Sequence, residues 1–177
     1  MGKIPKMVMI SERPAEVEDR AVPGHLDGDL IIGKDHQSAV CTLVERTTRF
    51  VRLLHLRAGK DAATVNEAMQ KAITTLLDQL VKTITWDQGS EMGRHVDFTV
   101  ETGTPIYFCD PHSPWQRGSN GNTNGLLRQY MPKGTDLSVH SVQDLNAIAK
   151  SLNNRPRKTL RYLKPSEKLA ELLATTP

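Results

Sequence analysis

The stretch GHLDGDLIIG, residues 24–33, decides the fold. It alternates loosely between apolar and polar residues and then becomes apolar, as a strand that enters a core does. Two segments rich in β-branched and apolar residues follow, SAVCTLVER (38–46) and RFVRLLHLR (49–57), and only GKDHQ and TT separate the three. Connections this short join antiparallel neighbours, so the segments predict a three-stranded antiparallel meander.

Helical and extended patterns alternate after the meander. DAATVNEAMQKAITTLLDQL (61–80) has apolar residues at the i, i+3, i+4 and i+7 positions of an amphipathic helix. VKTITWD (81–87) and TPIYFCD (104–110) are predicted strands, and residues 89–102 between them are predicted to form a short helix. Helical connections of this kind join strands of one sheet.

The remainder of the chain is predicted to be helical. One helix begins between Gln116 and Thr123. The next begins at Ser141, where SVQD resembles a capping box with Asp in its fourth position, and Pro156 stops it. Pro165 opens a last short helix. The order of elements predicts an α/β fold with one five-stranded mixed sheet, three antiparallel strands and then β-α-β-α-β units, flanked by helices.

Length and composition fit one globular domain. A chain of 177 residues can bury a sizeable core, and 38% hydrophobic with 24% charged residues is not a disordered composition. Residues 1–20 are expected to be a loose lead-in and residues 21–177 the folded core. No apolar run is long enough for a membrane span, and MGKIPKMVMISERP has no apolar signal-peptide region, so the expected compartment is the cytoplasm. Cys41 and Cys109 are predicted to be free thiols.

The charge of the chain is divided unevenly. Residues 1–110 hold 13 Lys and Arg against 16 Asp and Glu, a balance of −3, whereas residues 111–177 hold 10 against 4, a balance of +6. A basic surface beside acidic residues suits a polyanionic substrate held near metal-binding carboxylates. A solvated basic helix face is the alternative interpretation.

Aspartates stand inside the predicted strands or at their ends. Asp27 and Asp29 lie two residues apart, so both point to one face of the first strand. Asp87 and Asp110 each close a later strand, at the carboxyl ends where open α/β sheets bind ligands. Carboxylate oxygens in this arrangement are the ligands that Mg²⁺ prefers. For Asp87 the alternative is a turn residue before QGS.

One glycine stands where a helix is expected to start. In SPWQRGSNGNTNG, residues 113–125, Gly121 costs roughly 0.5–1 kcal/mol against alanine in a helix. Either another residue type belongs there, or the glycine lets a second backbone approach closely. A phosphate-binding loop is disfavoured because the stretch lacks the GK[ST] ending.

Long blocks of the chain resemble a known family. GHLDGDLIIG, TLVERTTRFV, TWDQGSE, FCDPHSPWQRGSNGNTNGLLRQYMPKGTDLS and LNNRPRKTLRY, which occur in order between residues 20 and 170, are similar to the catalytic domain of bacterial insertion-sequence-thirty family transposases. That family lies within the retroviral-integrase-like DDE superfamily. The resemblance implies an RNase H-like fold and a triad of two aspartates and one glutamate that holds divalent metal.

Position by position, the resemblance places the first catalytic aspartate at Asp29 and the second at Asp87. The family's glutamate, from RGSNENTNG, falls at Gly121, 34 positions beyond Asp87. Gly121 thus stands where a catalytic carboxylate is expected, and this departure predicts impaired catalysis. Leu26 also replaces a tryptophan of the family's pattern. The family's N-terminal helix-turn-helix region is not expected within these residues.

The implied activity is metal-dependent DNA strand cleavage and strand transfer, with Mg²⁺ or Mn²⁺ and two ions in an intact site. The implied partner is double-stranded DNA. The implied working state is a homodimer or higher oligomer, and the implied location is the bacterial cytoplasm near the nucleoid. The alternative is a DNA-binding or dimerisation module that retains the fold without catalysis. The side chains expected to contact DNA phosphates come from the basic half: Arg117, Arg128, Lys133, Arg155, Arg157 and Lys158.

Trp115 allows two interpretations. Its indole either stacks on a DNA base or covers the core, and covering the core is the favoured one.

Overall fold

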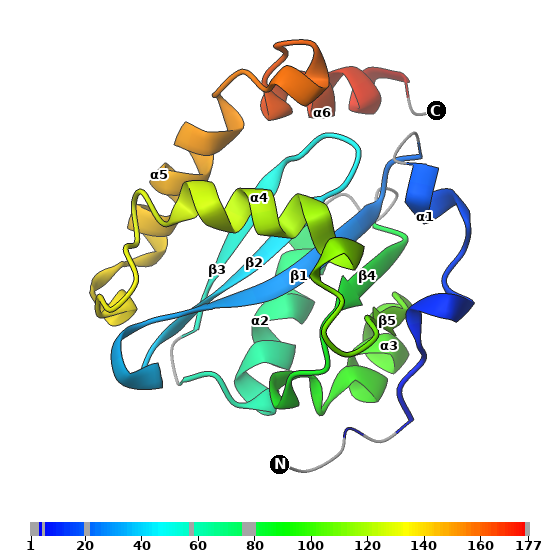
Figure 1. The fold of residues 1–177 in the computed structure, drawn as a ribbon, viewed down its shortest axis with the longest axis vertical. Coiled ribbons are helices and arrows are strands. Elements are labelled where there is room, and N and C mark those ends of the chain that lie inside the picture. Colours follow the sequence, from blue (N-terminus) through cyan, green and yellow to red (C-terminus); the bar gives the residue numbers. More distant parts are fainter. Residues whose placement is uncertain (1–3, 5, 20–21, 57–58, 76–80, 176–177) are drawn as a thin grey trace.

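The computed structural model describes residues 4, 6–19, 22–56, 59–75 and 81–175 (Figure 1). Its centre is one five-stranded sheet in the order β3-β2-β1-β4-β5, which confirms the predicted mixed sheet. The strands are β1 (His25–Ile32), β2 (Ala39–Glu45), β3 (Val51–His55), β4 (Thr83–Trp86) and β5 (Ile106–Phe108).

Two kinds of pairing meet at β1. The short connections make β1, β2 and β3 antiparallel neighbours, so the predicted meander is confirmed. Helical crossovers then bring β4 alongside β1, and β5 alongside β4, in parallel. The first strand of the chain is therefore the central strand of the sheet, with the meander on one side and the parallel strands on the other.

Helices cover both faces of the sheet (Figure 1). On one face, α2 (Ala62–Thr75) and α3 (His95–Thr102) bury an apolar cluster that includes Met69, Trp86 and Phe98. Residues 76–80, predicted to continue α2, lie outside the described residues. The opposite face holds a second cluster under α4 (Gly118–Leu127) and α5 (Val142–Asn153), and α6 (Pro165–Thr175) follows α5. In the described ranges, no helix is long and apolar enough to cross a membrane.

The two ends of α5 are fixed by side chains. The predicted capping box is present: Ser141 Oγ accepts from Asp144 N at 3.0 Å, and Asp144 Oδ2 accepts from Ser141 N at 2.9 Å. At the other end, the Asn153 amide donates to Val51 O at 3.0 Å and accepts from Val51 N at 2.9 Å. Asn153 thereby satisfies backbone groups that the edge strand β3 would otherwise leave open.

The described part of the N-terminal segment packs against the sheet. Val17, in α1 (Glu16–Asp19), is fully buried, and Arg13 is 8% exposed. Arg13 Nη1 donates to Thr85 Oγ1 of β4 at 2.9 Å. Phe108 N of β5 donates to Val8 O at 2.9 Å. The predicted boundary between lead-in and core near residue 20 stays a prediction.

Candidate active site

A polar stripe crosses the two central strands. Alternate residues of β1, His25 and Asp27, pair with Thr83 and Thr85 of β4, so the four side chains share one face of the sheet. Asp29 continues the stripe toward the carboxyl end of β1. Two residues further along, Ile31 belongs to the apolar cluster under α4 and α5. The polar stripe therefore lies on the face that α4 covers.

The same register brings Asp29 and Asp87 to one level of the sheet. The last residue pair between β1 and β4 is Asp27 with Thr85, and each catalytic candidate lies two residues further along its own strand direction. Asp87 directly follows β4, and both aspartates are half-buried. Because neighbouring strands lie about 4.8 Å apart, the two residues occupy neighbouring positions at the carboxyl edge of the sheet.

Asp27 and Asp29 differ although they share a face. Asp27 is fully buried, and Arg46 Nη1 donates to its Oδ1 at 2.9 Å and to its Oδ2 at 3.0 Å. Arg46 is itself 4% exposed. A buried carboxylate that forms an ion pair with a buried guanidinium has a structural role. Asp29 instead accepts from neutral donors, Leu30 N at 2.8 Å and Asn124 Nδ2 at 3.0 Å.

Asp87 is held by the turn that follows it. Its Oδ1 accepts from Gly89 N at 3.0 Å, so the turn role that was the alternative interpretation is present and orients the carboxylate. Trp86 is fixed next to it, because its Nε1 donates to Glu91 Oε1 at 3.0 Å. The Trp86 ring packs against Gly28, where an added Cβ would come within 2.1 Å of two ring atoms.

Position 121 lies on the helix that reaches Asp29. Gly121 and Asn124 are three residues apart in α4, so both lie on neighbouring parts of one helix surface. A Cβ built on Gly121 meets nothing within 4 Å, and the position is exposed. The alternative that Gly121 admits a second backbone is therefore wrong. Sequence reasoning missed Asn124, although its i+3 spacing from the expected glutamate position could have identified it.

Asp29 and Asp87 offer the ligand type of a hard divalent cation. Asp29 and Asp87 supply carboxylate oxygens on adjacent strands, which is the ligand type that Mg²⁺ and Mn²⁺ take. Within the described residues, no group of three or more His, Cys, Asp or Glu side chains is placed to hold a metal. Gly121 supplies no side chain, and the open space at its Cβ would admit one.

Burial and two nearby carboxylates raise the pKa of one cysteine thiol. Cys41 of β2 is completely buried, and burial raises the pKa of its thiol, with the negative charges of Asp29 and Glu91 adding to the effect. Both cysteines are free, as predicted. The thiol therefore stays protonated and is not a nucleophile in this site.

Several basic candidates gather around the end of α4. Arg128 donates to Ile32 O and to Met131 O, so it ties α4 to the end of β1. Arg155 donates to Tyr130 OH at 2.9 Å, and burial, followed by the charge of Arg155, lowers the pKa of Arg157. Lys133 and Lys158 are exposed, and the Arg117 side chain lies outside the described part.

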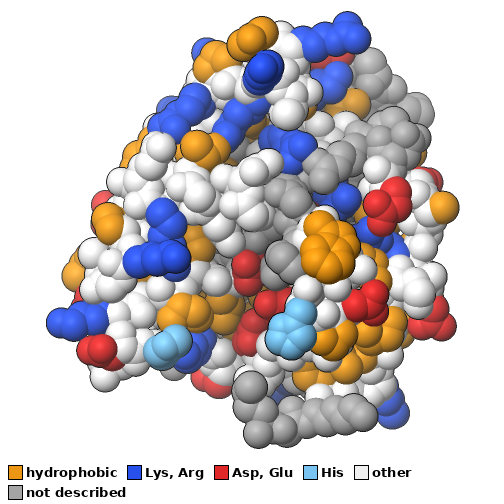
Figure 2. Space-filling view, in the orientation of Figure 1, with side chains coloured by type: hydrophobic (Ala, Val, Ile, Leu, Met, Phe, Trp, Pro, Cys, Tyr) orange, Lys and Arg blue, Asp and Glu red, His pale blue; other side chains and the backbone are white. Residues whose placement is uncertain are grey.

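Figure 2 shows the distribution of charge on the face that α4 crosses. Asp and Glu side chains gather at its centre, and Lys and Arg side chains lie above and to the left of them. This arrangement matches the predicted basic surface beside acidic residues. The individual DNA contacts stay predictions.

Trp115 does not cover the core. It lies on the 3-10 helix Pro114–Arg117 that precedes α4, and its side chain is 73% exposed. The favoured interpretation of this tryptophan was therefore wrong. The face of the sheet that α4 covers is filled by other apolar side chains, among them Leu127, Met131 and Leu145.

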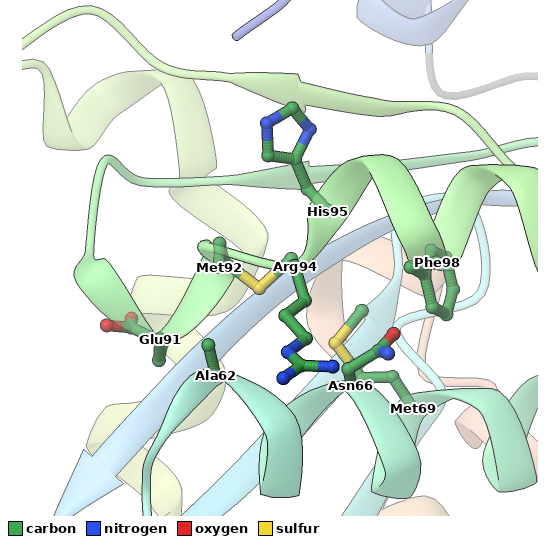
Figure 3. Close-up of a pocket in the computed structure, with 8 residues that line it drawn as sticks. All are labelled: Ala62, Asn66, Met69, Glu91, Met92, Arg94, His95 and Phe98. Carbon is green, nitrogen blue, oxygen red and sulfur yellow. The ribbon is translucent and has the colours of Figure 1, made fainter. Parts of the chain in front are cut away.

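A crevice elsewhere is too small for a ligand. It lies between α2 and α3, has a volume of about 10 Å³, and is lined by Asn66, Met69 and Arg94 among other residues (Figure 3). Such a volume holds at most about one water molecule. It belongs to the helical layer opposite the polar stripe.

The chain belongs to the integrase core domain family. Residues 19–114, more than half of the chain, match the model of that family. The chain is 54% identical, over 98% of its length, to the transposase for insertion sequence element IS1086 of Cupriavidus metallidurans. It is 47% identical, over 94% of its length, to transposase InsI for IS30A of Escherichia coli K12, and 42% identical over 97% to the transposase for IS4351 of Bacteroides fragilis.

These relatives confirm the resemblance to the insertion-sequence-thirty family. The chain spans about half the length of each curated relative, 51%, 43% and 52% respectively. A chain in the cryo-EM structure of a simian T-cell lymphotropic virus intasome, in complex with PP2A regulatory subunit B56 gamma, is similar in fold. The TM-score is 0.58 at 16% identity, over 75% of this chain and 49% of that chain, and the likeness confirms the predicted RNase H-like fold.

Proposed function

We propose that this integrase core domain carries the catalytic site for metal-dependent DNA strand cleavage and strand transfer, with Asp29 and Asp87 as its two aspartates. The supporting observation is the register of β1 and β4, in which Asp27 pairs with Thr85, two residues before Asp29 and Asp87 on their respective segments. The printed names of the curated relatives, transposases of insertion sequences, support DNA as the substrate class.

The residues of the site have two proposed roles: the aspartates bind metal ions, and their hydrogen-bond donors orient the carboxylates. Asp29 and Asp87 would hold Mg²⁺ or Mn²⁺, and two such ions, when bound, activate the attacking oxygen and stabilise the leaving one. Asn124 Nδ2 and Leu30 N hold the Asp29 carboxylate in place, and Gly89 N holds that of Asp87. Fixed ligands of this kind lower the reorganisation that the reaction requires.

Gly121 is proposed to impair this site. It lies one helical turn before Asn124, with open space at its Cβ, and no carboxylate comes from this position. The loss of one ligand from a catalytic metal site removes several kcal/mol of transition-state stabilisation, which is on the order of 10³-fold in rate. The chain as it stands should therefore cleave DNA poorly, and Gly121→Glu should restore cleavage.

The test compares three proteins on matched DNA substrates with Mg²⁺ and with Mn²⁺. They are the chain as it stands, Gly121→Glu, and Gly121→Glu combined with Asp29→Asn. Cleavage is expected from the second protein only, because the restored glutamate still needs Asp29. Equal cleavage rates for the first two proteins would remove position 121 from the site.

A second candidate function is a DNA-binding or dimerisation module without catalysis, and Gly121 is the observation that favours it. We propose double-stranded DNA as the partner in both cases and a homodimer or higher oligomer as the working state. The +6 balance of residues 111–177 predicts DNA affinity that falls steeply with salt. If Gly121→Glu binds DNA in a salt-dependent way but does not cleave it, the non-catalytic module is the correct interpretation. Sedimentation of the free protein measures its oligomeric state.

A further inference from the structure

A closed loop follows β5, the strand next to the one that Asp87 follows. Asp110 N donates to Gln116 Oε1 at 2.9 Å, and Gln116 Nε2 donates back to Asp110 Oδ2 at 3.1 Å. The two hydrogen bonds join the ends of residues 110–116. Inside the loop, His112 has φ 57°, a left-handed conformation that is uncommon for residues other than glycine. The two hydrogen bonds therefore give the loop a defined conformation.

The sheet places this loop next to Asp87. Trp86 of β4 pairs with Phe108 of β5, so Asp87 is level with Cys109, the residue before the loop. Gln88 Nε2 donates to Cys109 O at 3.1 Å and fastens the two strand ends together. From Asp87 to Trp115, across one strand spacing and the Asp110–Gln116 closure, the path is within about 20 Å. That distance corresponds to at most about six nucleotides of a DNA strand, at about 3.4 Å each.

The loop presents one large aromatic ring to solvent. The Trp115 side chain is 73% exposed, and among the described residues no hydrogen bond or ring contact involves it. Burial of an indole removes about 150–250 Å² from water, so an indole held outside the core gives up a large stabilising term. The chain's other tryptophan, Trp86, is fully buried.

We propose that Trp115 is a base-stacking residue, whose indole receives an unpaired nucleobase close to the phosphate that Asp29 and Asp87 act on. The inference rests on the proposed function, because it takes DNA as the substrate. Every base has a π-face, and stacking on an aromatic side chain stabilises bound single strands without sequence preference. Trp115 thereby holds the strand end open and in register with the carboxylates.

The loop sequence favours a base over an apolar protein surface. Polar residues of the loop, His112, Ser113 and Gln116, accompany the single aromatic ring of Trp115. A protein-docking patch needs contiguous apolar area, whereas a stacked base needs one ring.

The test measures binding without catalysis, in EDTA, so that its outcome does not depend on the metal site. The probes are a blunt duplex and the same duplex with a forked, unpaired end that carries 2-aminopurine. Trp115→Ala is expected to weaken binding of the forked DNA on the order of 10- to 100-fold, with a smaller effect on the blunt duplex. Trp115→Phe should recover much of the affinity. Tyr162→Ala, which removes another exposed aromatic ring, is the matched control.

Intrinsic fluorescence gives a second readout. Because Trp86 is buried, quenching of the protein emission by forked DNA reports Trp115, and Trp115→Phe should abolish that quenching. Unchanged affinity in Trp115→Ala together with unquenched emission would overturn the proposal, and so would a loss of self-association in that variant without an effect on DNA. If Gly121→Glu fails to cleave DNA while forked DNA still quenches Trp115, the proposed catalysis fails and base stacking stands.

Discussion

The buried ion pair of Arg46 and Asp27 should be the most sensitive polar contact in the fold. Arg46→Met keeps an unbranched apolar stem and removes the guanidinium from Asp27, which is fully buried. We expect a loss of about 3–5 kcal/mol in the free energy of unfolding, the usual cost of removing one partner from a buried pair. Typical domains have only about 5–15 kcal/mol in total, so the variant should fold but be fragile.

The geometry supports this magnitude. Arg46 Nη1 lies 2.9 and 3.0 Å from the two Asp27 oxygens, and the side chains are 4% and 0% exposed. At an effective dielectric constant of about 20, unit charges roughly 3 Å apart attract by about 5.5 kcal/mol. Arg46 Nε also donates to Val17 O at 3.3 Å, so the variant loses part of the anchor of α1 as well.

Urea unfolding measures the effect in a double-mutant cycle of Arg46→Met, Asp27→Asn and the two together. With a slope of about 2 kcal/mol per molar, the Arg46→Met midpoint should fall by about 1.5–2.5 M. The double variant should be less destabilised than the sum of the single variants by at least about 2 kcal/mol, since neither charge then stays buried. Additive losses within about 0.5 kcal/mol would refute the reasoning. Lys71→Met, in the exposed pair with Glu67, is the control and should cost less than about 0.5 kcal/mol.

Two further predictions concern stability. Burial lowers the pKa of His25 below its ordinary value despite its contact with Glu16, so as the pH falls the imidazole is protonated in the unfolded chain before it is protonated in the folded one. The free energy of unfolding should therefore fall as the pH drops below about 6.5. Urea unfolding of His25→Gln between pH 7.5 and 5.5 should show a weaker pH dependence than that of the unchanged chain. A steeper dependence in that variant would contradict this. Gly28→Ala should destabilise the fold by about 1–3 kcal/mol or more, because its Cβ meets the Trp86 ring at 2.1 Å. Gly121→Ala should leave the stability unchanged or raise it by about 0.5–1 kcal/mol, because its Cβ meets no other atom and alanine suits a helix. Thermal unfolding measures both effects. Similar melting temperatures for the two alanine variants would show that Trp86 moves aside freely.

Much of the fold follows from local patterns. The alternation in residues 24–57 and the short connections between its segments specify the meander, because side-chain period and loop length act within a few residues. The helical spacing in α2 and the SVQD start of α5 are similarly local, and the structure contains both. The resemblance of long blocks identified the family, and it predicts the catalytic positions Asp29, Asp87 and Gly121.

The roles of individual polar residues depended on the tertiary structure. The period of a strand places Asp27 and Asp29 on one face, but only the return of the chain at Arg46 makes Asp27 a buried ion-pair partner. Asn124 reaches Asp29 from 95 residues away, and no local pattern encodes such a contact. Trp115 is exposed on a loop that hydrogen bonds between Asp110 and Gln116 close, and no local pattern specifies that exposure. Local propensity and period are set by neighbours in the chain, whereas burial and charge pairing are set by neighbours in space.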